Sequence, residues 1–403
     1  MNILFLLSKH SINTKDSTLT KDLVNEFLKK GHNTFVVTIL EKKENKKTTY
    51  ELENGSMVLR SKTGNMFNDI GFIEKGITTL RMPFDLKKNI NKYLSNEKID
   101  LIISHTPFMS DPFLINFLKK KYNCPAFLIL WDIFPQNSKD LGLMKNKLLF
   151  KFFRRKEKKT YNLFDVIGCM SNGNINYLLE HNLKIVNKKL VLLMNWGNTK
   201  EINNLDKKEI RKKYGFKEEF IAIFGGNMGI PQKLENVIKL ARIYQDRKDI
   251  KFLFVGNGTE KNKIKKLAKD LNNTIFIDYI QREDYDKLVG CCDLGLVSLD
   301  ERFTVPNFPS KTLDYFKMSI PVLASLDNIS IKDYGMVLTD KAKAGLVANA
   351  GDIEEYKRKF EVLLNNSELR KELGTNGRKF YENNLSSNKA YNIIINSITS
   401  NDT

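Results

Sequence analysis

The stretch F-P-S-K-T-L-D-Y-F-K-M-S-I-P-V-L-A, residues 308–324, predicts a loop, a short helix and the start of a buried strand. Ser310 is a natural N-cap for the helix, and Pro321 ends it before the apolar residues 322–324. Lys311 lies at the helix start, where the helix dipole favours negative rather than positive charge. The mismatch disappears if an anion binds there, because free N–H groups and an ammonium together form a phosphate site.

Asp314 follows Lys311 by one helical turn, so the two side chains share a face. A cation for phosphate beside a carboxylate for sugar hydroxyls suits a nucleotide-sugar site. A surface helix with a simple ion pair is the alternative.

Around this stretch, segments of strand and helix character alternate, which predicts parallel α/β sheets in two domains. Predicted strands cover residues 2–7, 34–40, 99–104, 125–130, 166–170 and 190–193, then 220–224, 250–255, 274–278, 294–297, 322–324 and 345–347. Predicted helices cover residues 17–30, 231–245 and the region 352–400; residues 41–56 predict a loop or peripheral hairpin, and 195–217 the connection between domains.

The composition narrows the class of protein. The chain has 41% hydrophobic and 28% charged residues, and it lacks both an apolar run of about 18 residues and a signal-peptide pattern. Its four cysteines have no C-x-x-C spacing and its four histidines no metal-binding pattern. We therefore expect a cytoplasmic protein with reduced cysteines and no metal site.

The net charge of +19 is unevenly distributed: residues 1–197 carry +14 and the remainder +5. Half of the first excess comes from residues 143–161, which hold eight basic residues and one acid. There Lys151, Arg154 and Arg155 alternate with Phe152 and Phe153. A basic helix with such a stripe suits an anionic membrane surface. An ordinary amphipathic helix with a solvated basic face is the alternative.

Glycine-rich turns follow two strands of the second half, G-G-N-M-G at 225–229 and G-N-G at 256–258. Glycines let the backbone approach a ligand, and Lys233 places another cation at a predicted helix start. The pattern is not G-x-G-x-x-G, which disfavours NAD. In the first half, His105 and Asp132 each follow a strand, where α/β sheets bind ligands. A loop histidine and an N-cap aspartate are the alternatives.

Together these motifs resemble family 4 glycosyltransferases of the two-domain GT-B type, in the bacterial branch that makes capsule, O-antigen or exopolysaccharide. The resemblance rests on residues 226–241, 254–258, 292–297 and 309–324, and on D-I-F-P at 132–135. It implies two Rossmann-like domains facing across a cleft, residues 1–197 for the acceptor and 198–382 for the donor. A final helix, about 383–403, would pack back on the first domain.

The resemblance also implies transfer with retained configuration and without an essential metal or other cofactor. Asp314 stands where the family has a glutamate for the ribose hydroxyls, and Lys311, with Lys233, would neutralise the leaving diphosphate. His105 and Asp132 would complete the catalytic set. The expected donor contacts are Gly226, Asn227, Gly229, Lys233, Gly256, Gly258, Ser310, Lys311 and Asp314.

The chain departs from the family pattern at three positions. Pro306 stands eight residues before Asp314, where the family has a second acid, although Glu301 could reach the sugar from the preceding loop. Asn227 replaces a common arginine, and Gln136 replaces a frequent glutamate after D-x-x-P. These departures bear on which sugar is used more than on the fold.

The predicted function is therefore transfer of a sugar from a nucleotide-diphosphate sugar to a polyprenyl-diphosphate-linked saccharide in surface polysaccharide synthesis. UDP is the expected nucleotide, and an N-acetylated hexosamine or deoxy-hexosamine is one candidate sugar. The enzyme would lie on the inner face of the cell membrane and bind no nucleic acid. A UDP-sugar 2-epimerase on the same fold, or a basic nucleic-acid-binding protein, are the alternatives.

Overall fold

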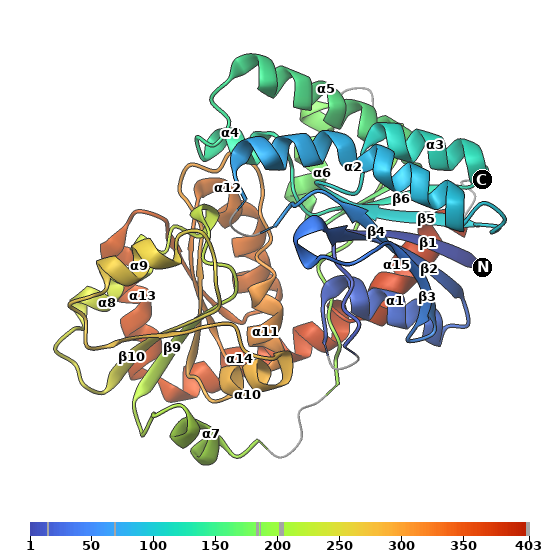
Figure 1. The fold of residues 1–403 in the computed structure, drawn as a ribbon. Coiled ribbons are helices and arrows are strands. Elements are labelled where there is room, and N and C mark those ends of the chain that lie inside the picture. The colour runs from blue at the N-terminus through green and yellow to red at the C-terminus, as the bar shows by residue number, and fades with distance from the viewer. Residues whose placement is uncertain (14–15, 68–69, 183–184, 186, 201–204, 400–403) are drawn as a thin grey trace. The chain divides into compact units, whose positions relative to one another are not determined.

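The chain folds into two compact units, shown in the computed structural model of Figure 1. The structure describes residues 1–13, 16–67, 70–182, 185, 187–200 and 205–399. Unit 1 comprises Met1–Met194 and the segment from Ser387, and unit 2 comprises Asn195–Ser386. The predicted boundaries lie at 197/198 and about 382/383, and residues 201–204 of the predicted connection fall outside the described residues.

Unit 1 is built on one sheet whose described strands follow the order β3-β4-β2-β1-β5-β6-β7-β8. All neighbours are parallel except β3 and β4. The central strands are apolar runs, and residues 3–6 are fully buried. The strands are β1 Asn2–Leu7, β2 Asn33–Glu41, β3 Thr49–Glu53, β4 Ser56–Thr63, β5 Leu101–His105, β6 Ala126–Leu130, β7 Val166–Cys169 and β8 Lys189–Leu192.

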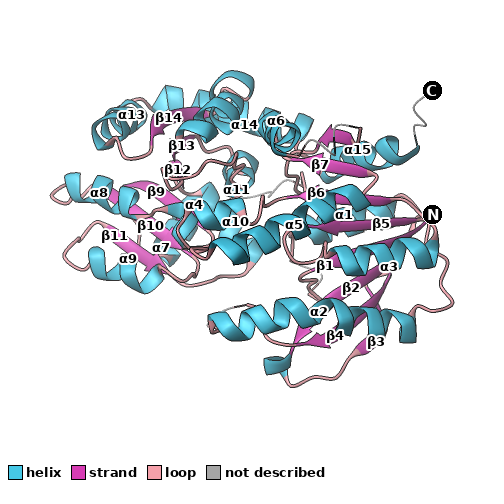
Figure 2. Ribbon diagram, turned by 90° about the horizontal axis from the view of Figure 1, so that it is seen from above, coloured by secondary structure: helices cyan, strands magenta, loops and turns pink. Residues whose placement is uncertain are grey.

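Helices cover both faces of this sheet, with α2, α3 and α5 on one face and α1 and α15 on the other (Figures 1 and 2). In α15, the Tyr391 hydroxyl lies 2.8 Å from His32 Nε2, and its ring packs on Phe27 of α1. The helices are α1 Leu19–Lys29, α2 Phe72–Tyr93, α3 Pro112–Tyr122, α4 Gln136–Asp140, α5 Lys147–Leu163, α6 Asn172–His181 and α15 Ser387–Thr399.

Unit 2 is built on a parallel sheet whose described strands follow the order β11-β10-β9-β12-β13-β14. Its strands are β9 Phe220–Gly225, β10 Ile250–Val255, β11 Thr274–Ile277, β12 Leu294–Ser298, β13 Val322–Leu326 and β14 Gly345–Asn349. Its α-helices are α7 Lys207–Lys213, α8 Glu235–Ile243, α9 Lys261–Leu267, α10 Arg282–Gly290, α11 Lys311–Lys317, α12 Asn328–Ser330, α13 Ile353–Asn365 and α14 Ser367–Asn384. The short elements are the 3-10 helix η1 Lys42–Glu44 in unit 1 and, in unit 2, the 3-10 helix η3 Ile230–Gln232 and the π-helical turns η4 Ile331–Gly335 and η5 Val337–Lys341.

The strand order reverses at β1/β5 in unit 1 and at β9/β12 in unit 2. Ligands of doubly wound sheets bind beyond the carboxyl ends of the strands at such a reversal. These two edges are therefore where a site is expected.

Three local predictions need correction. The helix predicted to start at Pro231 starts instead at Glu235, because η3 precedes it and Lys233 has a left-handed φ of 41°. The expected peripheral hairpin turns at Asn54 and Gly55, both with positive φ, and its second strand β4 pairs with β2 inside the sheet. No element was predicted for residues 57–98, where the structure has α2.

Candidate active site

The two glycine turns of unit 2, residues 225–229 and 256–258, lie against each other at the carboxyl ends of β9 and β10. We call them the glycine rim. The Gly226 N–H donates to the Val255 carbonyl at 2.9 Å, and the Met228 N–H donates to the Asn257 carbonyl at 2.9 Å. The Glu260 N–H in turn donates to the Met228 carbonyl. The backbone of this rim is therefore held in place before any ligand arrives.

The glycines of this rim serve two different purposes. A Cβ on Gly256 would lie 2.3 Å from the Gly226 carbonyl oxygen, and one on Gly258 would lie 2.4–2.6 Å from the Met228 backbone. Glycine is therefore needed at positions 256 and 258 because a side chain there would prevent the two turns from packing together. Gly226 has φ +110° and open space around it, and it is exposed together with Asn227, whereas Gly229 is buried. Gly226 and Asn227 are therefore the residues of this turn that a ligand can contact.

Lys311 is the first residue of α11, as the sequence predicted. Its Nζ donates to Gln232 Oε1 at 2.6 Å and lies 4.9 Å from the centre of the Phe224 ring. Burial lowers the pKa of the Lys311 ammonium from 10.5 to about 8. Ser310 occupies the N-cap position, but its side chain makes no capping bond. The site therefore holds a desolvated cation beside the glycine rim.

Lys233 is not at a helix start, because it ends η3 in the left-handed conformation. Its Nζ lies 3.5 Å from Glu301 Oε1 and 4.0 Å from Asp300 Oδ2. Asp300 is also bonded by Arg302 at 2.6 Å. The charge of Lys233 is therefore matched by acids of the loop after β12, which leaves Lys311 as the less compensated cation.

Asp314 lies in a cluster of ion pairs that the sequence did not predict. Its carboxylate is paired with Arg282 of α10, whose Nε lies 3.0 Å from Asp286 Oδ1. Lys317 donates to Asp286 at 2.7 Å. Burial raises the pKa of the Asp314 carboxyl, and the Arg282 guanidinium opposes that shift. The predicted ribose ligand thus has a protein partner, contributed from 32 residues earlier in the chain.

Tyr315 ties the rim to the sheet. Its buried hydroxyl accepts from the Gly225 N–H at 3.2 Å and lies 3.1 Å from the carbonyls of Ile223 and Leu296. The neighbouring Tyr285 hydroxyl is buried and has no hydrogen-bond partner among the described residues. One hydroxyl therefore supports the turn, and the second lies buried beside Gly225.

In unit 1, His105 lies at the end of β5, next to the strand-order reversal. Its Nε2 accepts from the Ser8 N–H at 3.1 Å, and its Nδ1 lies 2.8 Å from the Thr106 carbonyl. Nδ1 therefore carries the proton, and burial lowers the pKa of the ring to about 4. Its ring packs on Trp131 at 4.7 Å. This geometry suits a residue that positions the turn after β1 better than an acid or base.

Asp132 follows β6 and is exposed. Its N–H donates to Thr106 Oγ1 at 3.0 Å, and its carboxylate is bonded to no group of the described residues. It does not cap a helix, because α4 has Pro135 at its N-cap position. Although part of the residue is exposed, nearby protein desolvates its carboxyl and raises the pKa of Asp132 to about 6. Asp132 is therefore the better candidate for a base in this unit.

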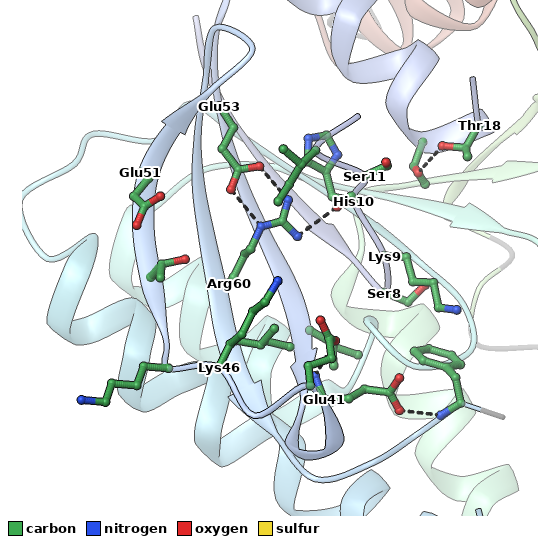
Figure 3. Close-up of a pocket in the computed structure, with 18 residues that line it drawn as sticks. Ser8, Lys9, His10, Ser11, Thr18, Glu41, Lys46, Glu51, Glu53 and Arg60 are labelled. Atoms are coloured by element: carbon green, nitrogen blue, oxygen red, sulfur yellow. Dashed lines mark hydrogen bonds and ion pairs between the residues drawn. The ribbon is translucent and has the colours of Figure 1, made fainter. Parts of the chain in front are cut away.

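A cavity of about 730 Å³ opens in unit 1 beside the carboxyl ends of β1 and β2 (Figure 3). Arg60 binds both carboxylate oxygens of Glu53, at 2.8 and 2.6 Å, and donates to the His10 carbonyl at 3.0 Å. Burial lowers the pKa of the His10 ring to about 4, and its Nδ1 has no partner among the described residues. The Lys9 ammonium lies 4.5 Å from the centre of the Phe67 ring.

Sequence reasoning missed most residues of this cavity; it predicted only that the loop of residues 9–20, after β1, contacts the phosphate of a donor or acceptor. The Asn54–Gly55 pair in the sequence is typical of a hairpin turn and could have predicted them. The hairpin places Glu53 and Arg60 on two paired strands. The cavity offers carboxylates, cations, hydroxyls and an aromatic ring, which is the chemistry that binds sugar hydroxyls and their phosphates.

The basic segment forms α5, and its predicted membrane residues face different ways. Lys151, Phe152 and Arg155 are exposed. The Phe153 ring instead packs on Phe134 at 5.1 Å, and Arg154 is paired with Glu157 within the same helix. Helix α5 therefore has an inner face that packs on the protein through Phe153 and an outer face that exposes Phe152 and cations.

In the part of the chain that the structure describes, no group of three or more histidine, cysteine, aspartate or glutamate side chains is placed to hold a metal ion. None of the described helices is long and apolar enough to cross a membrane.

Comparison with known proteins agrees with this architecture. Residues 206–380 match the family described as Glycosyl transferases group 1. The chain is 28% identical over 312 residues to an uncharacterized glycosyltransferase of Methanocaldococcus jannaschii, MJ1178, covering 76% of each protein.

Solved structures share the fold over nearly the whole chain. Sucrose-phosphate synthase from Thermosynechococcus elongatus superposes with a TM-score of 0.76 at 14% identity, covering 97% of this chain and 96% of that one. Anabaena Alr3699/HepE in complex with UDP superposes with a TM-score of 0.68 at 14% identity over 100% of both chains. The fold is therefore GT-B, residues 206–380 match the glycosyl transferases group 1 family, and the chain is a glycosyltransferase.

Proposed function

We propose that the enzyme transfers a sugar from a UDP-sugar to a lipid-linked saccharide, with retention of the anomeric configuration. The observation that carries the proposal is the Lys311 ammonium, desolvated and held by Gln232 beside the glycine rim. A diphosphate would give this cation the negative partner that the protein only partly supplies. The UDP in the Anabaena structure that shares this fold supports uridine as the base.

The diphosphate is the leaving group, so charge develops on it as the bond to the sugar breaks. Lys311 stabilises that charge, and the exposed backbone at Gly226 and Asn227 lies beside it. Lys233 contributes only if the diphosphate competes with Glu301 for its ammonium. Asp314 reaches the ribose hydroxyls through a carboxylate that the Arg282 guanidinium holds in place.

The acceptor saccharide occupies the cavity of unit 1. The carboxylates of Glu51 and Glu53 accept hydrogen bonds from sugar hydroxyls, and the unpartnered His10 Nδ1 is a further acceptor or donor on the wall. Lys46 and Lys47 supply charge for the acceptor phosphates. Asp132, with its raised pKa, is the candidate to receive the proton of the attacking hydroxyl.

A polyprenyl-diphosphate carrier lies in a membrane, so the enzyme must reach one. The exposed basic residues Lys151 and Arg155 of α5, with Phe152 between them, suit peripheral attachment to an anionic surface. This supports a place on the inner face of the cell membrane and a role in surface polysaccharide synthesis. No essential metal or cofactor is required by this scheme.

The test is a thermal shift against UDP, GDP, dTDP, CMP and NAD, for the wild type and for Lys311→Ala. A ligand at 100 times its Kd stabilises by about 2.7 kcal/mol, so a bound nucleotide is readily seen. Lys287→Ala is the matched control, because Lys287 is also a lysine of unit 2 but is paired with Glu283, outside the Asp314 cluster. We expect stabilisation by UDP that Lys311→Ala loses and Lys287→Ala keeps. Stabilisation by none of the nucleotides would overturn the donor assignment.

Transfer itself is assayed with UDP-sugars and a polyprenyl-diphosphate-linked acceptor, and the anomeric configuration of the product is determined by NMR. Release of an epimerised UDP-sugar without acceptor would instead identify an epimerase. Salt-sensitive binding to DNA, with no response to UDP, would favour a nucleic-acid-binding protein.

A further inference from the structure

Helix α2 carries a second apolar face that nothing in the described structure covers. Ile73, Ile77, Leu80 and Phe84 are 78%, 61%, 51% and 58% exposed. Their spacing of four, three and four residues places them in one stripe along the first three turns. The opposite face of α2, represented by Leu86 and other buried residues, already packs on the sheet. The exposed stripe is therefore additional to what folding requires.

The stripe continues onto the neighbouring helices. The Phe84 ring lies 4.6 Å from the ring of Phe113 at the start of α3, and Phe113 is itself exposed. Leu148 and Phe152 are exposed on the first turns of α5. Helices α2, α3 and α5 lie on the same face of the unit 1 sheet, with α3 packed against both α2 and α5 (Figures 1 and 2). We call these seven side chains of α2, α3 and α5 the apolar patch.

Positive charge surrounds the apolar patch. The segments of α2, α3 and α5 contain fifteen basic and three acidic residues. Each of the acids has a partner: Asp85 pairs with Arg81, Glu157 with Arg154, and Glu74 accepts from an asparagine side chain. Exposed cations on the same three helices are Lys75, Arg81, Lys88, Lys92, Lys120, Lys147, Lys151, Arg155, Lys158 and Lys159.

We propose that this face docks on an anionic lipid bilayer, with the α2 stripe lying in the interface between headgroups and acyl chains. A helix that is apolar on one side and flanked by lysines binds in this way, because burial of the apolar side chains adds to attraction for anionic headgroups. A second copy of the chain fits less well, since it would bring an equally positive face against this one. An acidic protein would satisfy the cations but leaves the stripe unexplained.

The inference rests on the proposed use of a lipid-linked acceptor, and it extends that proposal from the electrostatics of α5 to apolar insertion by α2. Salt separates the two contributions. Attraction of lysines to headgroups is screened at high ionic strength, whereas the apolar contribution of the stripe persists.

The first experiment measures co-sedimentation of the full chain with vesicles of mixed phosphatidylglycerol and phosphatidylcholine. The double variant Ile73→Ser, Ile77→Ser keeps the charge and removes half of the stripe. Leu52→Ser is the matched control, because Leu52 is 70% exposed but lies on β3. We expect the double variant to lower partitioning at least about tenfold and the control to change it less than about twofold.

A second measurement places a reporter in the stripe. In Leu80→Trp, the new tryptophan should shift its emission to the blue on vesicle addition and be quenched by lipids brominated on the acyl chains. Equal partitioning of the wild type and the double variant, or a tryptophan that stays in water, would overturn the proposal. So would a dimer in solution that the double variant dissociates without any vesicle binding.

The UDP thermal shift is recorded for every variant. A protein that keeps the UDP response but loses the vesicles supports the docking face independently of the donor site. A protein that binds vesicles through α2 but no nucleotide would refute the proposed function and leave the docking face standing.

Discussion

Replacing Lys311 by methionine should stabilise the protein while it weakens nucleotide binding. The ammonium is desolvated, bonded to one amide oxygen of Gln232, and its pKa is lowered from 10.5 to about 8. That difference corresponds to about 3 kcal/mol favouring the neutral amine in the folded state. Since the residue keeps some contact with solvent, we expect about 1–3 kcal/mol of added stability for Lys311→Met at pH 7.

The stability difference between the wild type and Lys311→Met should depend on pH. The folded pKa of Lys311 lies below the unfolded value, so the folded state binds fewer protons between pH 8 and 10.5. Wild-type stability therefore gains from rising pH across that window, and Lys311→Met does not. The difference in the free energy of unfolding between the two proteins should be largest below pH 8 and should vanish above about pH 10.5.

The assay is scanning calorimetry of the full chain at several pH values, with UDP titrations alongside. For a domain of this size, 1 kcal/mol shifts Tm by about 2–4 °C, so a rise of several degrees is expected at pH 7. Loss of a charge-assisted bond should weaken UDP binding about 10- to 100-fold. Lys317→Met, which breaks the pair with Asp286, should lower Tm instead. A lower Tm for Lys311→Met, or an unchanged UDP affinity, would refute the reasoning.

Three other predictions follow from individual contacts. Tyr315→Phe removes the hydroxyl shared by a backbone N–H and two carbonyls and should cost about 1–3 kcal/mol in the free energy of unfolding measured with urea. If Asp132 is the base, kcat/KM rises with pH through about 6 as its carboxyl loses a proton, and Asp132→Asn should abolish this rise. A rise that persists in the variant would exclude Asp132 as the base. Gly258→Ala places a Cβ 2.4–2.6 Å from the Met228 backbone and should lower both Tm and UDP affinity, whereas Gly71→Ala, with nothing within 4 Å, should change neither.

The elements that followed from the sequence are those set by short-range pattern. The apolar runs at 2–7 and 220–224 became the central strands β1 and β9, because a run of that length is buried on both faces only inside a parallel sheet. Lys311 began α11 as predicted. The start of α8 was misplaced because a left-handed residue, Lys233, separates it from the preceding turn. Helix α2 was not predicted from the sequence. Its apolar residues lie on two faces, which hides the 3.6-residue period of a helix with one apolar face, and Pro83 lies within it.

What the sequence by itself determined was the alternation of strands and helices, the position of the glycine turns and of Lys311, and the excess of positive charge in the first half. These depend on residues near one another in the chain. The partners of each charged group depended on the tertiary structure. Arg282 reaches Asp314 from another helix, and Glu301 reaches Lys233 from another loop. Such pairs decide which cation remains for a ligand, and only the packing of distant segments brings them within contact distance.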